Sequence, residues 1–263
     1  PNWMTHLAFE EHSPVWHHFL EFFSEAHRFV RYDQRGNGLS DWNCGDISFD
    51  TFRSDLDAVV DAFVEEPVVI LGISQGAPIA IDLAVRRPDR VRGLILLGGF
   101  VTGMANRGDD AREASRAVES LIRFGWGRDD PSMRTLFTSN LMPGGSKRQM
   151  DWYNEMMRIG TPPENAVRIR HALSHIDISD LLGQICVPTL VCHARGDRVA
   201  PFAEGERLAK EIPGARFVPL DSDNHILLEH EKAWVTFSME VRHFLESELL
   251  TSPHHHSKIN VSI

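Results

Sequence analysis

The stretch Val68-Val-Ile-Leu-Gly-Ile-Ser-Gln-Gly76 carries the sharpest structural signal in this chain of 263 residues. Residues 68–71 are aliphatic, which predicts a short buried strand. Residues 75–87 are apolar on most sides of a helical period, which predicts a helix packed deep against a sheet. Glycines flank Ser74 at the junction, so the pattern predicts a strand, a tight turn and a helix.

Short apolar runs alternate with amphipathic helical patterns on both sides of this stretch. Such alternation is typical of a mostly parallel sheet covered by helices on both faces. We therefore predict an α/β fold whose core comprises residues 1–100 and 181–250. Further strands are expected at 27–32, 91–97, 189–192 and 216–220.

The strand pattern stops between residues 101 and 180. An excursion of about 80 residues is too long for a structureless loop, so we predict a helical cap folded over one end of the sheet. At least two of its large apolar side chains are expected to roof a pocket above Ser74. The cap helices are expected at 111–124, 132–141, 147–159 and 163–176. The candidate roof residues are Phe124, Trp126, Phe137, Leu141, Met142, Trp152, Met156 and Met157.

Both ends of the chain depart from these patterns. The chain starts at Pro1 without an initiator Met, which raises the expectation of further residues upstream. Residues 251–263 follow the last expected helix and show no periodicity. We interpret them as a disordered or cloning-derived tail in preference to a metal-binding His run.

Composition narrows the classes of partner. The formal net charge of -10 disfavours binding to nucleic acid or to an anionic membrane. No apolar run approaches the roughly 18 residues of a membrane span, so a cytoplasmic protein is the default expectation. The three cysteines have no metal-binding spacing and do not suggest disulfides. Composition leaves the oligomeric state open.

Ser74 is the candidate nucleophile. A strand-to-helix turn lifts its hydroxyl clear of the sheet and places it at a helix N-terminus, where backbone N–H groups favour developing negative charge. The alternative is a glycine-rich packing turn, because the bare Gly-x-Ser-x-Gly spacing also arises by chance. The position between a buried strand and a helix favours the nucleophile.

A serine hydroxyl also needs a base and an orienting acid. In a fold of this kind both follow later strands, in the order serine, acid, histidine. Asp197 follows the strand expected at 189–192, and His225 follows the strand expected at 216–220. We therefore predict His225 as the base and Asp197 as the acid, with Asp223 as the alternative acid.

Four motifs carry a resemblance to a known family: Tyr32-Asp-Gln-Arg-Gly-Asn-Gly-Leu-Ser-Asp41, Leu71-Gly-Ile-Ser-Gln-Gly76, Gly196-Asp197 and Asn224-His225. Together they resemble the α/β-hydrolase superfamily, in particular its single-lidded esterase and haloperoxidase-like members. The resemblance covers most of the chain, up to residue 248. More narrowly, it extends to hydrolase domains found beside bacterial cyclase or transcriptional-regulator modules. The narrower likeness rests on Pro1-Asn-Trp-Met4, Ser13-Pro-Val-Trp16 and Leu227-Leu-Glu229.

The resemblance implies ester hydrolysis through an acyl-serine intermediate, with no cofactor and no metal. Relatives that cleave carbon–halogen bonds or epoxides are disfavoured, because they place Asp where this chain has Ser74. Members usually carry His-Gly before an oxyanion-hole residue, whereas the matching stretch here is Pro1-Asn-Trp3. The expected oxyanion donors are the backbone N–H groups of Gln75 and Trp3, and losing one donor typically costs about 10²–10³ in rate.

The same resemblance implies strands ahead of that loop, one of them central in the sheet. This chain contains no such strands before Trp3. We expect either that residues upstream of Pro1 supply the central strand or that the sheet is rearranged.

The leading hypothesis is an esterase acting on short-to-medium uncharged acyl groups, since no Lys or Arg is obviously placed to receive a carboxylate. A C–C bond hydrolase or acyl-transfer enzyme with the same triad is the alternative within the fold. A ligand-binding regulatory or sensor domain with weak turnover is the alternative from another class, and the missing His-Gly favours it.

Overall fold

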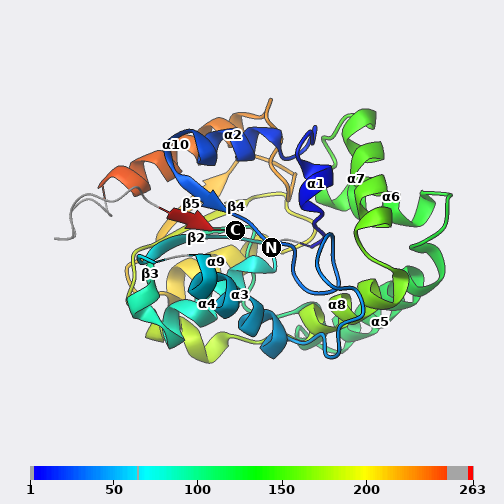
Figure 1. Ribbon diagram of the computed structural model, residues 1–263, viewed down its shortest axis with the longest axis horizontal. Helices are drawn as coiled ribbons and strands as arrows, with labels where there is room; N and C mark the ends of the chain where they lie inside the picture. Colours follow the sequence, from blue (N-terminus) through cyan, green and yellow to red (C-terminus); the bar gives the residue numbers. More distant parts are fainter. Residues whose placement is uncertain (1–2, 64, 248–259, 263) are drawn as a thin grey trace.

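The computed structural model describes residues 3–63, 65–247 and 260–262. Within these residues the centre is a six-stranded sheet in the order β1-β6-β2-β3-β4-β5, in which all neighbouring strands are parallel (Figure 1). This confirms the predicted α/β class and the mostly parallel sheet. The strands are β1 (Arg28–Val30), β2 (Val68–Ile73), β3 (Val91–Leu97), β4 (Thr189–Ala194), β5 (Arg216–Leu220) and β6 (Asn260–Ser262).

Helices cover both faces of the sheet (Figure 1). Helices α2 and α10 lie on one face, α3, α4 and α9 lie on the other, and α5 to α8 gather beyond one end of the strands. The helices are α1 (Leu7–Glu10), α2 (His17–Ala26), α3 (Phe49–Phe63), α4 (Gly76–Arg86), α5 (Asp109–Gly125), α6 (Ser132–Leu141), α7 (Lys147–Gly160), α8 (Pro163–Ser174), α9 (Phe202–Glu211) and α10 (Lys232–Ser247).

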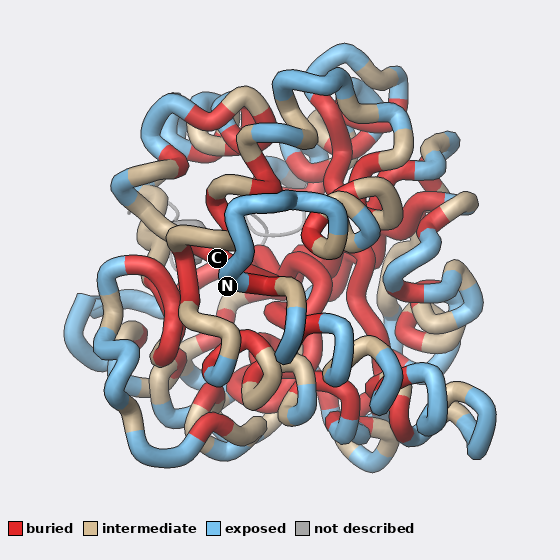
Figure 2. Tube along the Cα trace, turned by 90° about the vertical axis from the view of Figure 1, so that its right-hand side faces the viewer, coloured by how far each residue is buried: buried red, intermediate tan, exposed pale blue. Residues whose placement is uncertain are grey.

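The hydrophobic core consists of the buried central strands and the apolar faces of the helices that cover them. Every residue of β2 is buried, because α4 covers one face of the sheet there and neighbouring strands cover its edges. In α3 the residues at helical spacing, Phe52, Leu56 and Val60, are buried, whereas the opposite face is exposed. Full burial of each such side chain contributes about 1.5–3 kcal/mol. Figure 2 shows the buried trace concentrated at the strands and the exposed trace on the outer turns.

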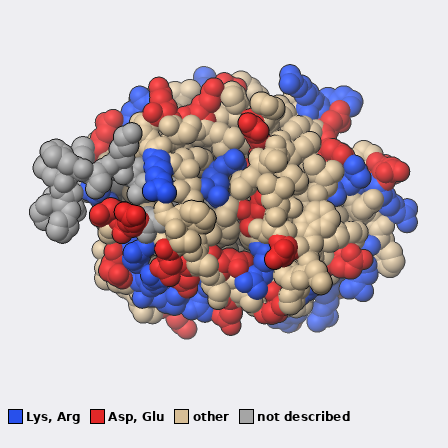
Figure 3. Space-filling model, viewed as in Figure 1, with Lys and Arg blue, Asp and Glu red and all other residues tan. Residues whose placement is uncertain are grey.

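The outer faces of α3 and α4 are joined by ion pairs. The buried carboxylate of Asp82 forms an ion pair with Arg53 at 2.8 Å and accepts from Arg86 at 2.5 Å. Arg86 also pairs with Asp57 at 2.9 Å. Figure 3 shows acidic and basic side chains interleaved on the lower side of the molecule, where these helices lie. No helix in the described residues combines the length and apolar character needed to cross a bilayer.

Strand β6 corrects the interpretation of the C-terminal residues. Residues 251–259 and 263 lie outside the described residues, but 260–262 pair in parallel with β1 on one side and with β2 on the other. Without β6, the facing edges of β1 and β2 would leave backbone N–H and C=O groups unpaired. Within the described residues, β6 thus lies between β1 and β2 and pairs with both edges. Three residues are too few to show strand periodicity, which is why the pattern missed them.

The helical excursion begins and ends at one place. Thr102 and Asp177 form an antiparallel bridge, Gly103 N donates to Ile176 O at 2.8 Å, and Ile178 N donates to Val101 O at 3.1 Å. An added Cβ at Gly103 would lie 2.4 Å from Leu173 O, so only glycine fits this crossing. The chain thus leaves the sheet and rejoins it at one place, and the helices between are also bonded to core loops, as by Gly38 N to Gly160 O at 2.7 Å.

A buried arginine organises the interior of the excursion. Arg134 on α6 is 1% exposed, and its guanidinium donates to the backbone oxygens of Trp126, Arg128 and Asn154. The indole of Trp126 is also buried and donates to Thr161 O at 3.1 Å. The bonds to Trp126 O and Arg128 O satisfy carbonyls at the C-terminal end of α5, where a helix leaves acceptors unpaired. The bond to Asn154 O joins α6 to the middle of α7.

His18 is a titratable group inside the packing between α2 and α10. It is 6% exposed, its ring lies edge-on to Trp234 with centroids 4.3 Å apart, and its Nε2 donates to Leu227 O at 3.1 Å. Burial lowers the pKa of His18 to about 4, although the bond to Leu227 O opposes the shift. His18 is therefore neutral in the folded protein at neutral pH, while an exposed histidine has a pKa of about 6.5.

We predict that His18 makes the fold acid-sensitive. The unfolded chain takes up the proton first, so stability is fully present above about pH 6.5 and is lost as the pH falls towards 4. At about pH 5 the loss from this group is about 2 kcal/mol. Urea unfolding at about pH 7.5 and pH 5 should show a smaller pH difference in His18→Gln, which keeps a donor for Leu227 O. His17→Gln, on the exposed side of α2, should keep the wild-type difference. An unchanged difference in His18→Gln would contradict the assignment.

Candidate active site

Ser74 occupies the turn between β2 and α4, and its backbone is left-handed, with φ of 54°. The turn is held by two hydrogen bonds: Ser74 N donates to Leu97 O at 2.8 Å, and Ala77 N donates to Ser74 O at 3.1 Å. An added Cβ at Gly72 would lie 2.8 Å from Ala77 Cα, so the turn closes only over a glycine. The strand, tight turn and helix predicted from the sequence are all present.

Asp197 and His225 come from the loops after β4 and β5, and their side chains meet. His225 Nδ1 and Asp197 Oδ2 are 2.6 Å apart, and both side chains are buried. The other oxygen, Asp197 Oδ1, accepts from the backbone N–H groups of Val199 at 2.7 Å and Ala200 at 2.9 Å. Because the carboxylate accepts a hydrogen bond from Nδ1–H, His225 presents the lone pair of Nε2, which has no hydrogen-bond partner among the described residues.

The loop after β3 brings the dyad close to Ser74. Leu97 accepts the backbone bond of Ser74, and the next residue, Gly98, has φ of 58°. An added Cβ at Gly98 would lie 2.9 Å from His225 Cε1, so the imidazole ring packs directly against this backbone. Within the described residues Ser74 Oγ and His225 Nε2 do not hydrogen-bond to each other, a separation common in unliganded active sites.

Asp197 is held in its charged form. Burial alone would raise its pKa, but the charge of His225 and the hydrogen bonds from His193 and His225 hold the pKa of this carboxyl well below its usual range. His193 is fully buried in β4, and its Nε2 donates to Ala200 O at 2.9 Å while lying 3.5 Å from Asp197 Oδ2. Sequence reasoning missed His193, although its position at the end of a strand four residues before Asp197 was a usable signal.

Asp223, the alternative acid, has a different environment. Asp223 is exposed. A Cβ added at Gly196 would lie 1.9 Å from Asp223 Oδ1, so the Asp223 side chain packs directly against the loop that carries Asp197. Its neighbour Asn224 is buried and its Oδ1 accepts from Gly144 N in the excursion at 2.8 Å. The geometry therefore pairs His225 with Asp197 and leaves Asp223 as a brace between loops.

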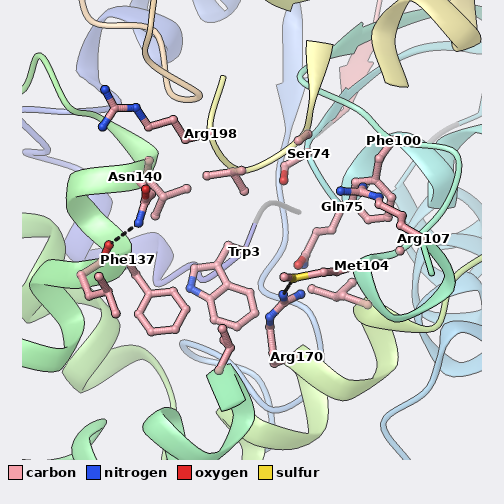
Figure 4. Close-up of a pocket in the computed structure, with 17 residues that line it drawn as sticks. Trp3, Ser74, Gln75, Phe100, Met104, Arg107, Phe137, Asn140, Arg170 and Arg198 are labelled. Atoms are coloured by element: carbon pink, nitrogen blue, oxygen red, sulfur yellow. Dashed lines mark hydrogen bonds between the residues drawn. The ribbon is translucent and has the colours of Figure 1, made fainter. Parts of the chain in front are cut away.

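A pocket of about 340 Å³ opens at Ser74 (Figure 4). Two of the eight side chains expected to roof it, Phe137 and Leu141 of α6, line it. Phe124 is instead 72% exposed, and Trp126 is buried inside the excursion. The lining residues are Trp3, Ser74, Gln75, Phe100, Gly103, Met104, Arg107, Val118, Leu136, Phe137, Asn140, Leu141, Arg170, Leu173, Arg198, Val199 and Ala200.

Trp3 and Gln75 lie at this pocket, as their predicted role requires. The Trp3 ring stacks on Phe137 at a centroid distance of 6.1 Å and forms part of the wall. Gln75 directly precedes α4, so its backbone lies at the N-terminus of that helix. Its side chain donates to Gln34 Oε1 at 3.0 Å. The role of their backbone N–H groups as oxyanion donors stays a prediction.

The expected preference for uncharged acyl groups assumed that no Lys or Arg is placed to receive a carboxylate, and the structure places three arginines at the pocket. Arg107, Arg170 and Arg198 all line the cavity that contains Ser74. In α8, Arg170 falls on the same helical stripe as the buried Ala166 and Leu173, at spacings of four and three residues. A charged residue on a buried stripe was the signal that could have revealed it.

Comparison with known proteins places this fold and site in a family. Residues 6–231 match the family described as alpha/beta hydrolase fold. The chain belongs to this family. This α/β-hydrolase is 27% identical over 207 residues to AB hydrolase superfamily protein YisY of Bacillus subtilis, covering 78% of the chain and 77% of that protein. It is 26% identical over 227 residues to the pimeloyl-[acyl-carrier protein] methyl ester esterase of Nitrosomonas europaea, covering 79% and 81%.

Solved structures agree with the fold of this α/β-hydrolase. A hydrolase from Pseudomonas aeruginosa PA01 matches with a TM-score of 0.73 and 24% identity, over 88% of this chain and 84% of that one. The esterase EaEST from Exiguobacterium antarcticum matches with a TM-score of 0.69 and 24% identity, over 82% and 80%. At this identity the likeness shows the fold alone.

We predict that Asp197→Asn folds normally and loses roughly 10²–10⁴-fold in kcat for ester substrates. Asparagine fills the space but cannot stabilise a protonated His225, and it can favour the wrong imidazole tautomer. Asp223→Asn is the matched control and should keep a near-wild-type rate. Steady-state kinetics with circular dichroism as the folding check decides it. A small loss in Asp197→Asn together with a large loss in Asp223→Asn would reassign the acid.

Proposed function

We propose that this chain is a serine hydrolase that cleaves carboxylic esters through an acyl-serine intermediate. The proposal is carried by one observation: the buried Asp197–His225 pair, with an unpartnered Nε2, lies beside the Leu97–Gly98 loop that also holds the strained turn of Ser74. The similarity to a relative named as a methyl ester esterase supports it. It needs neither a metal nor a cofactor.

The proposed reaction has two halves. His225 Nε2 accepts the Ser74 proton as Oγ attacks the ester carbonyl, and Asp197 stabilises the imidazolium that forms. The backbone N–H groups of Gln75 and Trp3 stabilise the oxyanion. His225 then donates its proton to the leaving alcohol, and the acyl group stays on Ser74. Water, activated by His225 in the same way, attacks the acyl-serine, releases the carboxylic acid and restores Ser74.

We predict that Ser74 is the residue that reacts with an organophosphonate or a sulfonyl fluoride. Hydrolysis of short p-nitrophenyl esters should be lost in Ser74→Ala and should stop in the wild type as the label is incorporated. Mass spectrometry of the digested protein locates the adduct. Ser120→Ala, an exposed serine of α5, is the matched control and should react and turn over as the wild type does. Labelling of another residue in active protein, with Ser74 unmodified, would reject the nucleophile.

We predict that kcat/KM falls as the pH is lowered from about 8 to about 5, because a protonated imidazole cannot accept the Ser74 proton. The measurement is a pH profile under conditions where chemistry limits the rate, with the protein shown to remain folded at each pH. A flat profile would contradict the role of His225. Folded protein that binds ligands in the pocket but hardly turns over would favour the regulatory or sensor alternative.

A further inference from the structure

The wall of the pocket contains two cations, Arg107 and Arg170, of which Arg170 is the more enclosed. Its guanidinium donates to Met104 Sδ at 3.1 Å, a thioether that is a weak acceptor. Within the described part of the chain Arg170 forms no ion pair. The acidic side chain that acts on it, Glu119, accepts from His171 Nδ1 at 3.2 Å. Arg170 therefore keeps most of its donors for whatever enters the pocket.

Arg107 is the second cation, and the carboxylate nearest to it, Glu204, accepts hydrogen bonds from other residues. Arg107 Nε donates to Thr102 O at 2.8 Å and lies 3.8 Å from Glu204 Oε1. The carboxylate of Glu204 accepts from Val101 N at 2.6 Å, Thr102 N at 3.0 Å and Thr102 Oγ1 at 3.2 Å. Glu204 thus braces the start of the excursion, while the terminal nitrogens of Arg107 have no hydrogen bond among the described residues.

Placing these two cations together is unfavourable without an anion. Burial lowers the pKa of Arg170, Glu119 opposes this, and the charge of Arg107 lowers it further. The surrounding wall is largely apolar, with Phe100, Leu136 and Leu173 among the lining residues. A buried charge is costly unless a partner of opposite sign and suitable hydrogen bonds accompany it. A ligand that supplies an oxyanion removes both the repulsion and the unpaired donors.

We propose that Arg170 and Arg107 bind a carboxylate at the far end of the substrate, so that the enzyme acts on half-esters of short dicarboxylic acids. The inference rests on the proposed function for the ester end and on the arginines for the acid end. Figure 4 shows both side chains on the Met104 side of the pocket, whereas the Arg198 guanidinium points away from Ser74. Arginine presents a planar fork of donors that matches a carboxylate. The apolar side chains that line the pocket, Phe100, Leu136 and Leu173 among them, suit a short methylene chain.

The substrate test compares esters that differ only in the charge of the far end. Monoethyl glutarate is paired with the ethyl ester of glutaric acid monoamide, and the corresponding succinate and adipate pairs vary the chain length. We expect kcat/KM for the half-ester to exceed that of its amide partner by about 10-fold or more at one chain length at least. Equal rates, or faster amides at all three lengths, would overturn the proposal.

The variants test whether the preference comes from these arginines. Arg170→Gln and Arg107→Gln should each reduce the half-ester to amide ratio, by about 10–100-fold for Arg170. Arg116→Gln, an exposed arginine of α5 outside the pocket, is the matched control and should keep the wild-type ratio. If Arg170→Gln fails to fold, as judged by circular dichroism, the less enclosed Arg107→Gln decides. An unchanged ratio in the folded variants would overturn the proposal.

A binding measurement separates this proposal from the proposed function. Ser74→Ala is titrated calorimetrically with glutarate and with inorganic phosphate, and glutarate should bind more tightly. Adding Arg170→Gln should weaken glutarate by about 10-fold or more. Arg170-dependent glutarate binding in a protein that hydrolyses no ester would sustain the subsite and reject the esterase. Ester hydrolysis without glutarate binding would do the reverse. Phosphate binding as tightly as glutarate would overturn the carboxylate assignment.

Discussion

The left-handed backbone of Ser74 is the constraint around which the rest of the structure is arranged. This conformation costs a residue with a Cβ about 1–2 kcal/mol, and it persists only where the surroundings leave no other choice. Here β2 is buried along its whole length, and most of α4 is buried as well. The bond from Ser74 N to Leu97 O fixes the turn to β3. Relaxing the turn would break a strand pairing or displace a packed helix, so the serine stays at the mouth of the pocket.

The site holds charges of both signs. The Asp197 carboxylate lies against His193 and His225, and the pocket wall contains Arg107 and Arg170. Arg107 lies 3.8 Å from Glu204, whereas Arg170 forms no ion pair among the described residues. The chain as a whole carries a net charge of -10, so its long-range field repels anions. Recognition of an anion would therefore depend on short-range contacts inside the cavity, where screening by salt is weakest.

The sequence predicted the sheet class and the strand, turn and helix around Ser74, because each depends on local periodicity and on glycines at fixed positions. It also placed Asp197 and His225 after the right strands, and the 2.6 Å contact between them agrees with that order. It missed β6, whose three residues acquire a role only between β1 and β2. It also missed Arg170, because the pocket it lines is assembled from segments far apart in the chain.

At the bridge between Thr102 and Asp177 the chain leaves the sheet and returns to it. The side chains proposed for bond cleavage stand on loops of the sheet, whereas Phe137, Leu141 and Arg170 stand on helices that leave and rejoin the sheet at that bridge. Exchanges between residues 103 and 176 would change side chains that line the cavity. They would also reach the loop that carries His225, because Gly144 N donates to Asn224 Oδ1 and Ile226 N donates to Leu141 O. The excursion therefore couples the shape of the cavity to the position of the proposed base.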